Sequence, residues 1–205
     1  FCVHIPMRAS NNQNVQAVFE LLKPFAEVHV MSGHTHYAEN NVYDSHYEHV
    51  HGAACGAWWN STINVDGTPN GYAIYNIKGA TSTHRVYQAT GLDAQQQIRL
   101  YRANDIFMRD YSKNYQFYYK GDDQIVANVW NADKDWKIEV YENGIKTGEM
   151  THFDYTGNEK DKSWDAWALG YHIGVVGKAE LDSNKKPTSY YQRNVRHLYY
   201  YTLQS

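Results

Sequence analysis

The chain has 205 residues and a formal net charge of -3 at pH 7. This length fits one large domain or two small ones, and either can bury an adequate core. The sequence shows no clustered basic patch of the kind that nucleic-acid binding requires, and no apolar run approaches the roughly 18 to 20 residues of a membrane span. We therefore expect a globular chain with no nucleic-acid partner and no membrane span.

The first residue is Phe1, and no charged-then-apolar leader of the kind that directs secretion follows it. We interpret Phe1 as a cut end and expect the sequence to be part of a longer protein. Cys2 and Cys55 are the only cysteines. They are too few for a disulfide framework and lack the spacing of a zinc or redox motif, so a bond between them is left open.

The first segment follows a strand, helix, strand pattern. Residues 2–6 are typical of the end of a buried strand, and Ser10 or Asn11 can cap the helix that follows. Residues 27–32 alternate as a strand and run into the loop 33–36. A right-handed crossover would place the two strand ends side by side, at the edge where open α/β sheets bind ligands. The helix has apolar residues at helical spacing, which are Val15, Val18, Phe19 and Leu22.

From about residue 47 onward the pattern favours β-strands. A boundary near Gly91 divides the chain into a domain of residues 1–90 and a domain of residues 91–205. The second region has the size of an antiparallel β-sandwich, and its Asn143-Gly144 pair is a strong hairpin turn. The fold class predicted is α+β, mostly β. Strands are expected at residues 48–55, 72–77, 84–89, 97–101, 124–130, 136–141, 148–153 and 190–202.

Histidines at the two expected strand ends carry the strongest chemical signal. The motif Gly-His-Thr-His at residues 33–36 can aim His34 and His36 at two adjacent positions, and its glycine lets the backbone pass close to an ion. His4 ends the preceding strand. Neutral imidazole suits zinc, iron, manganese and nickel. The spacing of the pair alone is equally compatible with two loop histidines, whereas three histidines on one edge are much more specific.

These two motifs resemble the last two metal motifs of the calcineurin-like metallophosphoesterases, a strand-terminal histidine often followed by proline and then Gly-His-x-His. Residues 48–59, 66–72 and 129–136 resemble a bacterial subgroup of that family that has an extra C-terminal β-domain. The resemblance covers most of the chain. It implies that residues 1–90 are the C-terminal half of an α/β-sandwich catalytic domain and that residues 91–205 are the accessory β-sandwich.

The resemblance also implies the chemistry. His4 and His34 would hold one metal ion and His36 its neighbour, the ions being divalent or trivalent Mn, Fe, Zn or Ni. Two ions about 3.5–4 Å apart would activate a hydroxide that attacks a phosphomonoester or phosphodiester of unknown identity. The family's Asp-x-His, Gly-Asp-x-x-Asp and Gly-Asn-His-Asp/Glu motifs would precede His4. We therefore expect this chain to lack the N-terminal half of the catalytic domain, to bind metal weakly and to be inactive alone.

The same subgroup implies an exported bacterial protein, periplasmic or secreted. The alternative function is a secreted β-sandwich module that binds a glycan or another ligand, with incidental histidines. A third interpretation is that the β-domain only packs on the catalytic domain and shapes its cleft.

Other histidines and aromatic residues also allow two interpretations. His46, His49 and His51 could bind a separate ion, but we favour a solvated strand face near the rim of the site. Trp58-Trp59 and the tyrosines 199–201 could form stacking platforms. We favour their filling the core and edges of a sandwich, because β-strands are rich in aromatic residues.

Overall fold

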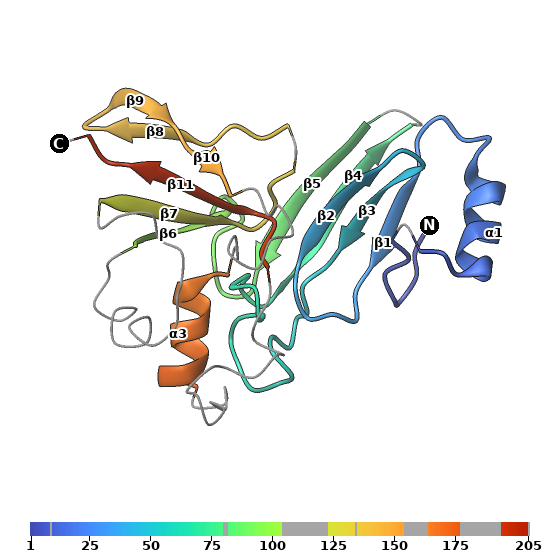
Figure 1. Ribbon diagram of the computed structural model, residues 1–205, viewed down its shortest axis with the longest axis horizontal. Helices are drawn as coiled ribbons and strands as arrows, with labels where there is room; N and C mark the ends of the chain where they lie inside the picture. The colour runs from blue at the N-terminus through green and yellow to red at the C-terminus, as the bar shows by residue number, and fades with distance from the viewer. Residues whose placement is uncertain are drawn as a thin grey trace.

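The computed structural model describes residues 1–8, 10–79, 82–103, 123–133, 135–153, 164–176 and 194–204. These residues are mostly β, with two helices and several small sheets (Figure 1). The predicted α+β class, mostly β, is confirmed at this level. None of the helices described is long and apolar enough to cross a membrane.

The first helix, α1, spans Gln13–Leu22 and begins after the cap residue Asn12, whose side chain accepts hydrogen bonds from two backbone N–H groups of the first turn. The cap was predicted at Ser10 or Asn11. Ser10 instead accepts a hydrogen bond from the backbone N–H of Asn12, at 3.1 Å, so the turn before the helix is longer than expected. The predicted apolar face is confirmed, and it packs in one cluster: Val15, Val18, Phe19 and Leu22 with Met7 and Val30.

A three-stranded sheet packs against this helix. Strand β1 (His29–Ser32) runs parallel to β3 (His46–Val50), and β2 (Glu39–Tyr43) pairs antiparallel with β3, in the order β1-β3-β2. Cys2 makes an isolated parallel bridge to Met31. The first residues of the chain therefore run parallel to β1, as the predicted crossover requires.

Two strands of this region differ from expectation. The strand predicted at residues 48–55 ends at Val50, and the chain then bends away, with the backbone N–H of His51 bound to the Ser32 carbonyl. Strand β2 was not predicted, because it is rich in Glu and Asn, which strands disfavour. It forms because β3 pairs with all of its residues.

A long hairpin connects this sheet to the rest of the molecule. Strands β4 (Gly71–Lys78) and β5 (Ser82–Ala89) pair antiparallel, which confirms the two strands predicted there. From β5, the side chain of Arg85 donates hydrogen bonds to His49 of β3 and to the carbonyl of Asn131. The hairpin therefore bridges the two sheets, as its position in Figure 1 also shows.

The C-terminal region is built on one antiparallel sheet of the order β10-β11-β7-β6. A separate hairpin is closed by Asn143 and Gly144, with φ of 50° and 82°, so the predicted Asn-Gly turn is confirmed. In the described part of this region, one sheet and one hairpin do not establish the predicted sandwich, which stays a prediction. The strands are β6 (Ile98–Arg102), β7 (Gln124–Val129), β8 (Glu139–Glu142), β9 (Ile145–Glu149), β10 (Thr151–His152) and β11 (Leu198–Thr202).

The strand predicted at residues 190–202 is therefore shorter than expected, and residues 190–193 lie outside the described part of the chain. Helix α3 (Ala166–Gly174) was not predicted, because its aromatic residues favour strands. Packing decides its conformation, since Ala166 shares a core cluster with Val126 of β7 and Leu198 of β11.

Candidate functional site

The carboxyl ends of the first two predicted strands meet at one edge of the sheet. The backbone N–H of Gly33 donates to the carbonyl of His4 at 3.1 Å. His4 Nε2 and His34 Nδ1 are 3.1 Å apart, and the two rings are nearly perpendicular at 74°. Both side chains are exposed. The structure thus brings His4 and His34 together as the crossover predicts, while their role as metal ligands stays a prediction.

The loop that carries the paired histidines has an unusual backbone. His34 and His36 both lie in the left-handed region, with φ of 70° and 58°. This conformation is uncommon for residues other than glycine and clusters at functional sites. A Cβ added at Gly33 would meet nothing within 4 Å, so open space lies beside the end of β1.

His36 is held away from the other two histidines by the segment that follows β3. Its Nδ1 lies 2.7 Å from the carbonyl of Gly56, and its ring stacks on Trp58 with a centroid distance of 5.3 Å. Because a carbonyl only accepts, Nδ1 carries the proton, and Nε2 is the ring nitrogen that could bind a metal. No group of three His, Cys, Asp or Glu side chains that could hold a metal occurs within the described ranges.

The donor atoms nonetheless fit a metal in part. Two imidazole nitrogens bound to one tetrahedral ion at about 2.1 Å would be about 3.4 Å apart. The observed separation between His4 and His34 is 3.1 Å. A small movement would therefore let these two residues share one ion, and His36 lies two residues after His34 on the same loop.

Sequence reasoning missed the residue that holds the loop after His4. Glu48 of β3 is fully buried, and its two carboxylate oxygens accept hydrogen bonds from the backbone N–H groups of Met7, at 2.6 Å, and Arg8, at 3.0 Å. Arg8 also has a positive φ of 50°. The only signal in the sequence is one acidic residue at a strand position, which more often faces solvent.

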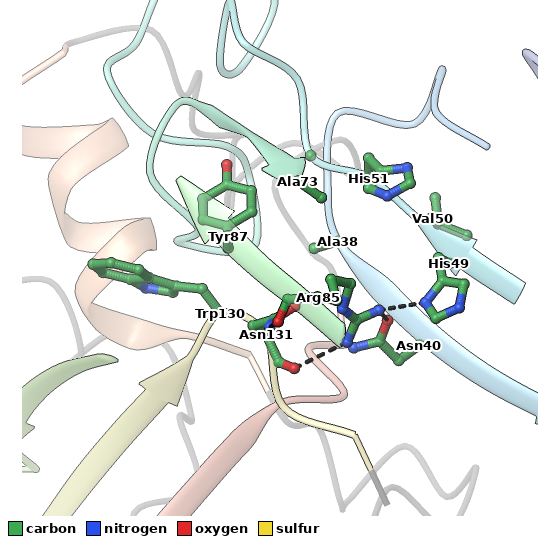
Figure 2. A pocket seen from close by; sticks show the side chains of 11 residues that line it. Ala38, Asn40, His49, Val50, His51, Ala73, Arg85, Tyr87, Trp130 and Asn131 are labelled. Atoms are coloured by element: carbon green, nitrogen blue, oxygen red, sulfur yellow. Dashed lines mark hydrogen bonds between the residues drawn. The ribbon is translucent and has the colours of Figure 1, made fainter. Parts of the chain in front are cut away.

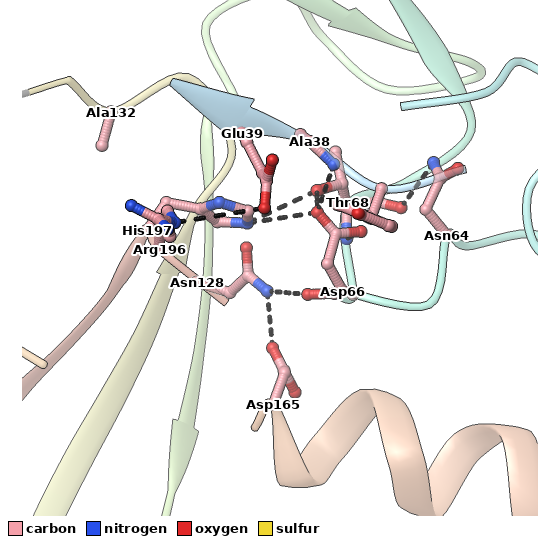
Figure 3. Close-up of polar contacts among 12 residues, drawn as sticks. Ala38, Glu39, Asn64, Asp66, Thr68, Asn128, Ala132, Asp165, Arg196 and His197 are labelled. Atoms are coloured by element: carbon pink, nitrogen blue, oxygen red, sulfur yellow. Dashed lines mark hydrogen bonds and ion pairs between the residues drawn. The ribbon is translucent and has the colours of Figure 1, made fainter. Parts of the chain in front are cut away.

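A second anchor reaches the histidine loop from the C-terminal side (Figure 3). Asp66 Oδ2 accepts hydrogen bonds from the backbone N–H of Ala38, at 2.8 Å, and from the Thr68 hydroxyl, at 2.6 Å. Ala38 lies two residues after His36, so Asp66 ties the loop to the body of the protein. Five buried residues make up this group, which we call the polar junction: Asp66, Thr68, Asn128, Asp165 and His197.

The polar junction joins three separate parts of the chain. Asn128 of β7 donates to the backbone carbonyl of Asp66, at 2.7 Å, and to Asp165 Oδ2, at 2.5 Å. Asp165 in turn caps α3 by accepting from the backbone N–H of Ala168, at 2.7 Å. The amino end of α3, strand β7 and the segment after Asn64 are therefore linked through buried polar groups.

Burial sets the protonation of the polar junction. It lowers the pKa of His197 to about 4, and it raises the pKa of Asp66 and of Asp165. His197 Nε2 lies 3.4 Å from Asp66 Oδ2 and 3.5 Å from the Thr68 hydroxyl. These residue types resemble a catalytic relay, but all of them are at most 3% exposed. No substrate can reach them, so we assign them a structural role.

A chain of hydrogen bonds runs through the sheet from Arg85, whose bonds to His49 and to the carbonyl of Asn131 are drawn in Figure 2. Arg85 donates to His49 Nδ1, His49 Nε2 lies 2.8 Å from His29 Nδ1, and His29 Nε2 lies 2.5 Å from a carboxylate oxygen of Glu27. Because Arg85 can only donate, His49 must donate onward to His29, and His29 to Glu27. Burial and the charge of Arg85 lower the pKa of His49 to about 2.

The solvated strand face predicted for His46 and His49 is therefore wrong, since both are buried. His46 stacks on Phe19 of α1 instead. His51 binds the Ser32 carbonyl and the Tyr75 hydroxyl, at 3.0 and 2.6 Å. A separate ion site at His49 and His51 also finds no support, because protein groups already occupy both ring nitrogens of each. A cavity of about 200 Å³ lies beside Arg85 and His49.

A family model described as the C terminal of calcineurin-like phosphoesterase matches residues 48–205. The chain belongs to this family. No match was found among curated proteins or among solved structures. The predicted relationship is thus confirmed, and membership implies a hydrolase, a phosphoesterase, as the parent protein.

The matched part of this phosphoesterase region begins at Glu48, inside β3. It includes the β4–β5 hairpin, the polar junction and the turn at residues 56–59 that contacts His36. The three candidate ligands, His4, His34 and His36, precede it. The boundary predicted at residues 90 and 91 stays a prediction. Calcineurin-like phosphoesterases generally bind divalent metals, which agrees with the chemistry of the imidazoles at this edge.

Two aromatic residues of the phosphoesterase region lie where they were not expected. Trp58 and Trp59 are 55% and 72% exposed, so the prediction that they fill a core is wrong for this pair. It is confirmed for Tyr199, which is buried in the C-terminal sheet. Trp58 and Trp59 belong to a tight turn after Gly56, which has a φ of 63°, and that turn directs both indoles outward beside His36.

Proposed function

We propose that the protein containing this chain hydrolyses phosphoesters at the edge formed by His4, His34 and His36, which we call the histidine edge. The observation that carries the proposal is the 3.1 Å separation of His4 Nε2 and His34 Nδ1 at adjoining strand ends. It occurs in a chain of the calcineurin-like phosphoesterase family. The two features together favour metal-dependent hydrolysis over any chemistry that the buried polar groups could perform.

In this proposal His4 and His34 bind one metal ion, and His36 binds a neighbouring ion through Nε2. Bound ions would polarise the phosphoryl oxygens and lower the pKa of the attacking water. The ions are Mn, Fe, Zn or Ni, since imidazole accepts each of them. The chain itself orients the ligands: the Gly56 carbonyl fixes the tautomer of His36, and Glu48 holds the loop after His4.

The remaining ligands, including a bridging carboxylate, would come from residues outside this chain. Three neutral imidazoles cannot balance the charge of two dications, so a carboxylate is needed between them. We accordingly propose that the 205-residue chain alone binds metal weakly and has no appreciable turnover. The polar junction and the β4–β5 hairpin would then serve to hold the histidine loop in place.

The test uses the full-length gene product with its resident metals. Hydrolysis of p-nitrophenyl phosphate and bis-p-nitrophenyl phosphate would be measured for His4→Ala, His34→Ala and His36→Ala, together with metal content. Each variant should lose at least about 100-fold in kcat/KM and lose bound metal. His152→Ala, in the C-terminal sheet, is the matched control and should keep both. Normal hydrolysis by the three variants would refute the assignment of these ligands.

The glycan-binding alternative is less well supported. The exposed pair of tryptophans lies against His36, at the proposed site, and not on the C-terminal sheet. A glycan screen on the full chain would still separate the two functions. Glycan binding that is lost on changing Trp136 or Tyr141, which are exposed in the C-terminal region, would favour the module.

A further inference from the structure

Trp58 and Trp59 form an exposed aromatic surface at the histidine edge. Their side chains are 55% and 72% exposed. The ring of His36 lies 5.3 Å from that of Trp58 and 5.5 Å from that of Trp59, centroid to centroid. A molecule bound on these indoles would therefore lie near a proposed metal ligand. Large exposed aromatic groups beside a site generally mark contact with a ligand.

The backbone holds the two indoles in this position against a conformational cost. Trp58 and Trp59 have φ of 47° and 59°, in the left-handed region, which costs about 1–2 kcal/mol for each residue with a side chain. Hydrogen bonds on both sides maintain it: the N–H of Ala57 binds the carbonyl of Ile63 at 3.0 Å, and the N–H of Asn60 binds the carbonyl of Ala57 at 3.0 Å. Such strain persists only where surrounding structure enforces it, and it clusters at sites of function.

The tight packing of the turn makes the platform formed by the two indoles rigid. At Gly56 an added Cβ would collide with the carbonyl of Ser61 and the side chain of Asn70, so the loop is closely packed beneath the indoles. Asn70 Nδ2 also donates to that Ser61 carbonyl at 3.0 Å. The indoles are therefore presented by a fixed loop, which lowers the entropy lost when a ligand binds.

The relative orientation of the rings selects the shape of the ligand. The planes of Trp58 and Trp59 are inclined by 57°, with centroids 6.1 Å apart. His36 is nearly parallel to Trp58, at 17°, and covers part of one face. A flat base stacks on a single aromatic face and makes no use of the second, inclined indole. Two inclined faces can both contact the apolar C–H groups of a puckered ring, and the exposed Asn60, next in the sequence, offers an amide for its hydroxyl groups.

We propose that Trp58 and Trp59 bind the sugar ring of a phosphorylated carbohydrate and thereby present its phosphoester at His36. This inference rests on the proposed function and names its substrate class. In the reaction, a water oxygen forms a bond to phosphorus and the bond between phosphorus and the sugar oxygen breaks. One water proton ends on the released sugar hydroxyl, so phosphate and a free sugar are the products of a monoester.

The experiment compares three monoesters on the full-length, metal-loaded protein: a hexose phosphate, glycerol phosphate, which has no ring, and p-nitrophenyl phosphate, which has a flat ring. Trp59→Ala should raise KM for the hexose phosphate about ten-fold, keep kcat within about two-fold, and leave glycerol phosphate unchanged. Trp136→Ala, which is a substitution at a partly exposed tryptophan in the C-terminal region, should change none of these values. Circular dichroism of each variant would establish that it is folded.

Equal effects of Trp59→Ala on the hexose and glycerol phosphates would overturn the proposal, as would a larger effect on p-nitrophenyl phosphate than on the hexose phosphate. A calorimetric titration with the hexose phosphate, on metal-free protein, separates this proposal from the proposed function. If no ester is hydrolysed but the hexose phosphate binds and this binding is lost in Trp59→Ala, the platform is supported and the hydrolytic assignment fails. Hydrolysis without any dependence on Trp58 or Trp59 would support the hydrolytic assignment and overturn the platform.

Discussion

The histidine edge and the polar junction use the same residue types in opposite ways. His4 and His34 are exposed, with ring nitrogens that face each other across 3.1 Å. His197 is buried beside Asp66, and its surroundings keep it neutral. The comparison teaches that residue type alone does not locate a reactive site in this protein. A ligand can reach the first group, whereas the second group is buried.

The two regions are also linked by hydrogen bonds. Asp66 of the polar junction binds the backbone N–H of Ala38, two residues after His36. The N–H of Val65 also contacts the carbonyl of His36, at 3.4 Å. The segment of residues 65–66 thus supports the loop that carries two of the proposed ligands, and the C-terminal region contacts that segment through Asn128 and His197. The following changes test this division of roles, from the largest expected effect to the smallest.

Removing the central carboxylate of the junction should have the largest effect. Asp66→Ala leaves the N–H of Ala38 and the buried hydroxyl of Thr68 without their acceptor, so we expect a loss of about 3–5 kcal/mol in the free energy of unfolding. Asp66→Asn keeps one acceptor oxygen and should cost less. Urea denaturation measures both, with the exposed Asp44→Ala as control at below about 0.5 kcal/mol. A loss under about 1 kcal/mol for Asp66→Ala would contradict the supporting role of the junction.

Glu48 should rank second, because it supports the histidine edge from within the sheet. Glu48→Ala removes the acceptor of two backbone N–H groups at Met7 and Arg8, and we expect about 2–4 kcal/mol of destabilisation. The full-length variant should also bind metal more weakly at His4. Chemical denaturation and metal titration are the measurements, with the exposed Glu142→Ala as control. Unchanged metal affinity in a destabilised variant would show that Glu48 stabilises the sheet without orienting the ligand.

Acidification should act through the buried histidines. The folded pKa of His49 is about 2, below its unfolded value near 6.5, so the unfolded state binds more protons between these values. Stability is therefore fully present above about pH 6.5 and falls with pH, by about 2 kcal/mol for His49 at pH 5. Raised pKa values of Asp66 and Asp165 oppose this trend.

The variant His49→Gln isolates the contribution of His49. The difference in unfolding free energy between wild type and variant should shrink by about 2 kcal/mol from pH 7 to pH 5. Parallel pH curves would rule it out.

The smallest effect on stability is expected at the aromatic platform. Trp59→Ala removes a side chain that is 72% exposed, so the free energy of unfolding should change by less than about 0.5 kcal/mol. The same substitution should weaken binding of a hexose phosphate about ten-fold. Thermal denaturation and the calorimetric titration provide the two values. A loss above about 2 kcal/mol would instead place Trp59 among the structural residues.

Local patterns in the sequence predicted a large part of the fold. The apolar spacing of α1, the alternation of β1 and the Asn143-Gly144 turn are confirmed, because each depends on neighbours within a few residues. The meeting of His4 and His34 followed from the strand, helix, strand order and the handedness of crossovers. These features depend on short stretches of sequence, so they can be inferred without knowing which other parts of the protein pack against them.

Only the tertiary structure decided the burial of the polar groups and the exposure of the tryptophans. His49 is buried because Arg85 reaches it from another hairpin, and Asp66 because it meets His197 from far along the chain. Helix α3 forms against three strands although its aromatic residues favour β-structure. In each case the free energy comes from groups distant in sequence. The sequence by itself therefore determined the local elements and the candidate ligands, whereas long-range packing determined which polar side chains face solvent and which support the fold.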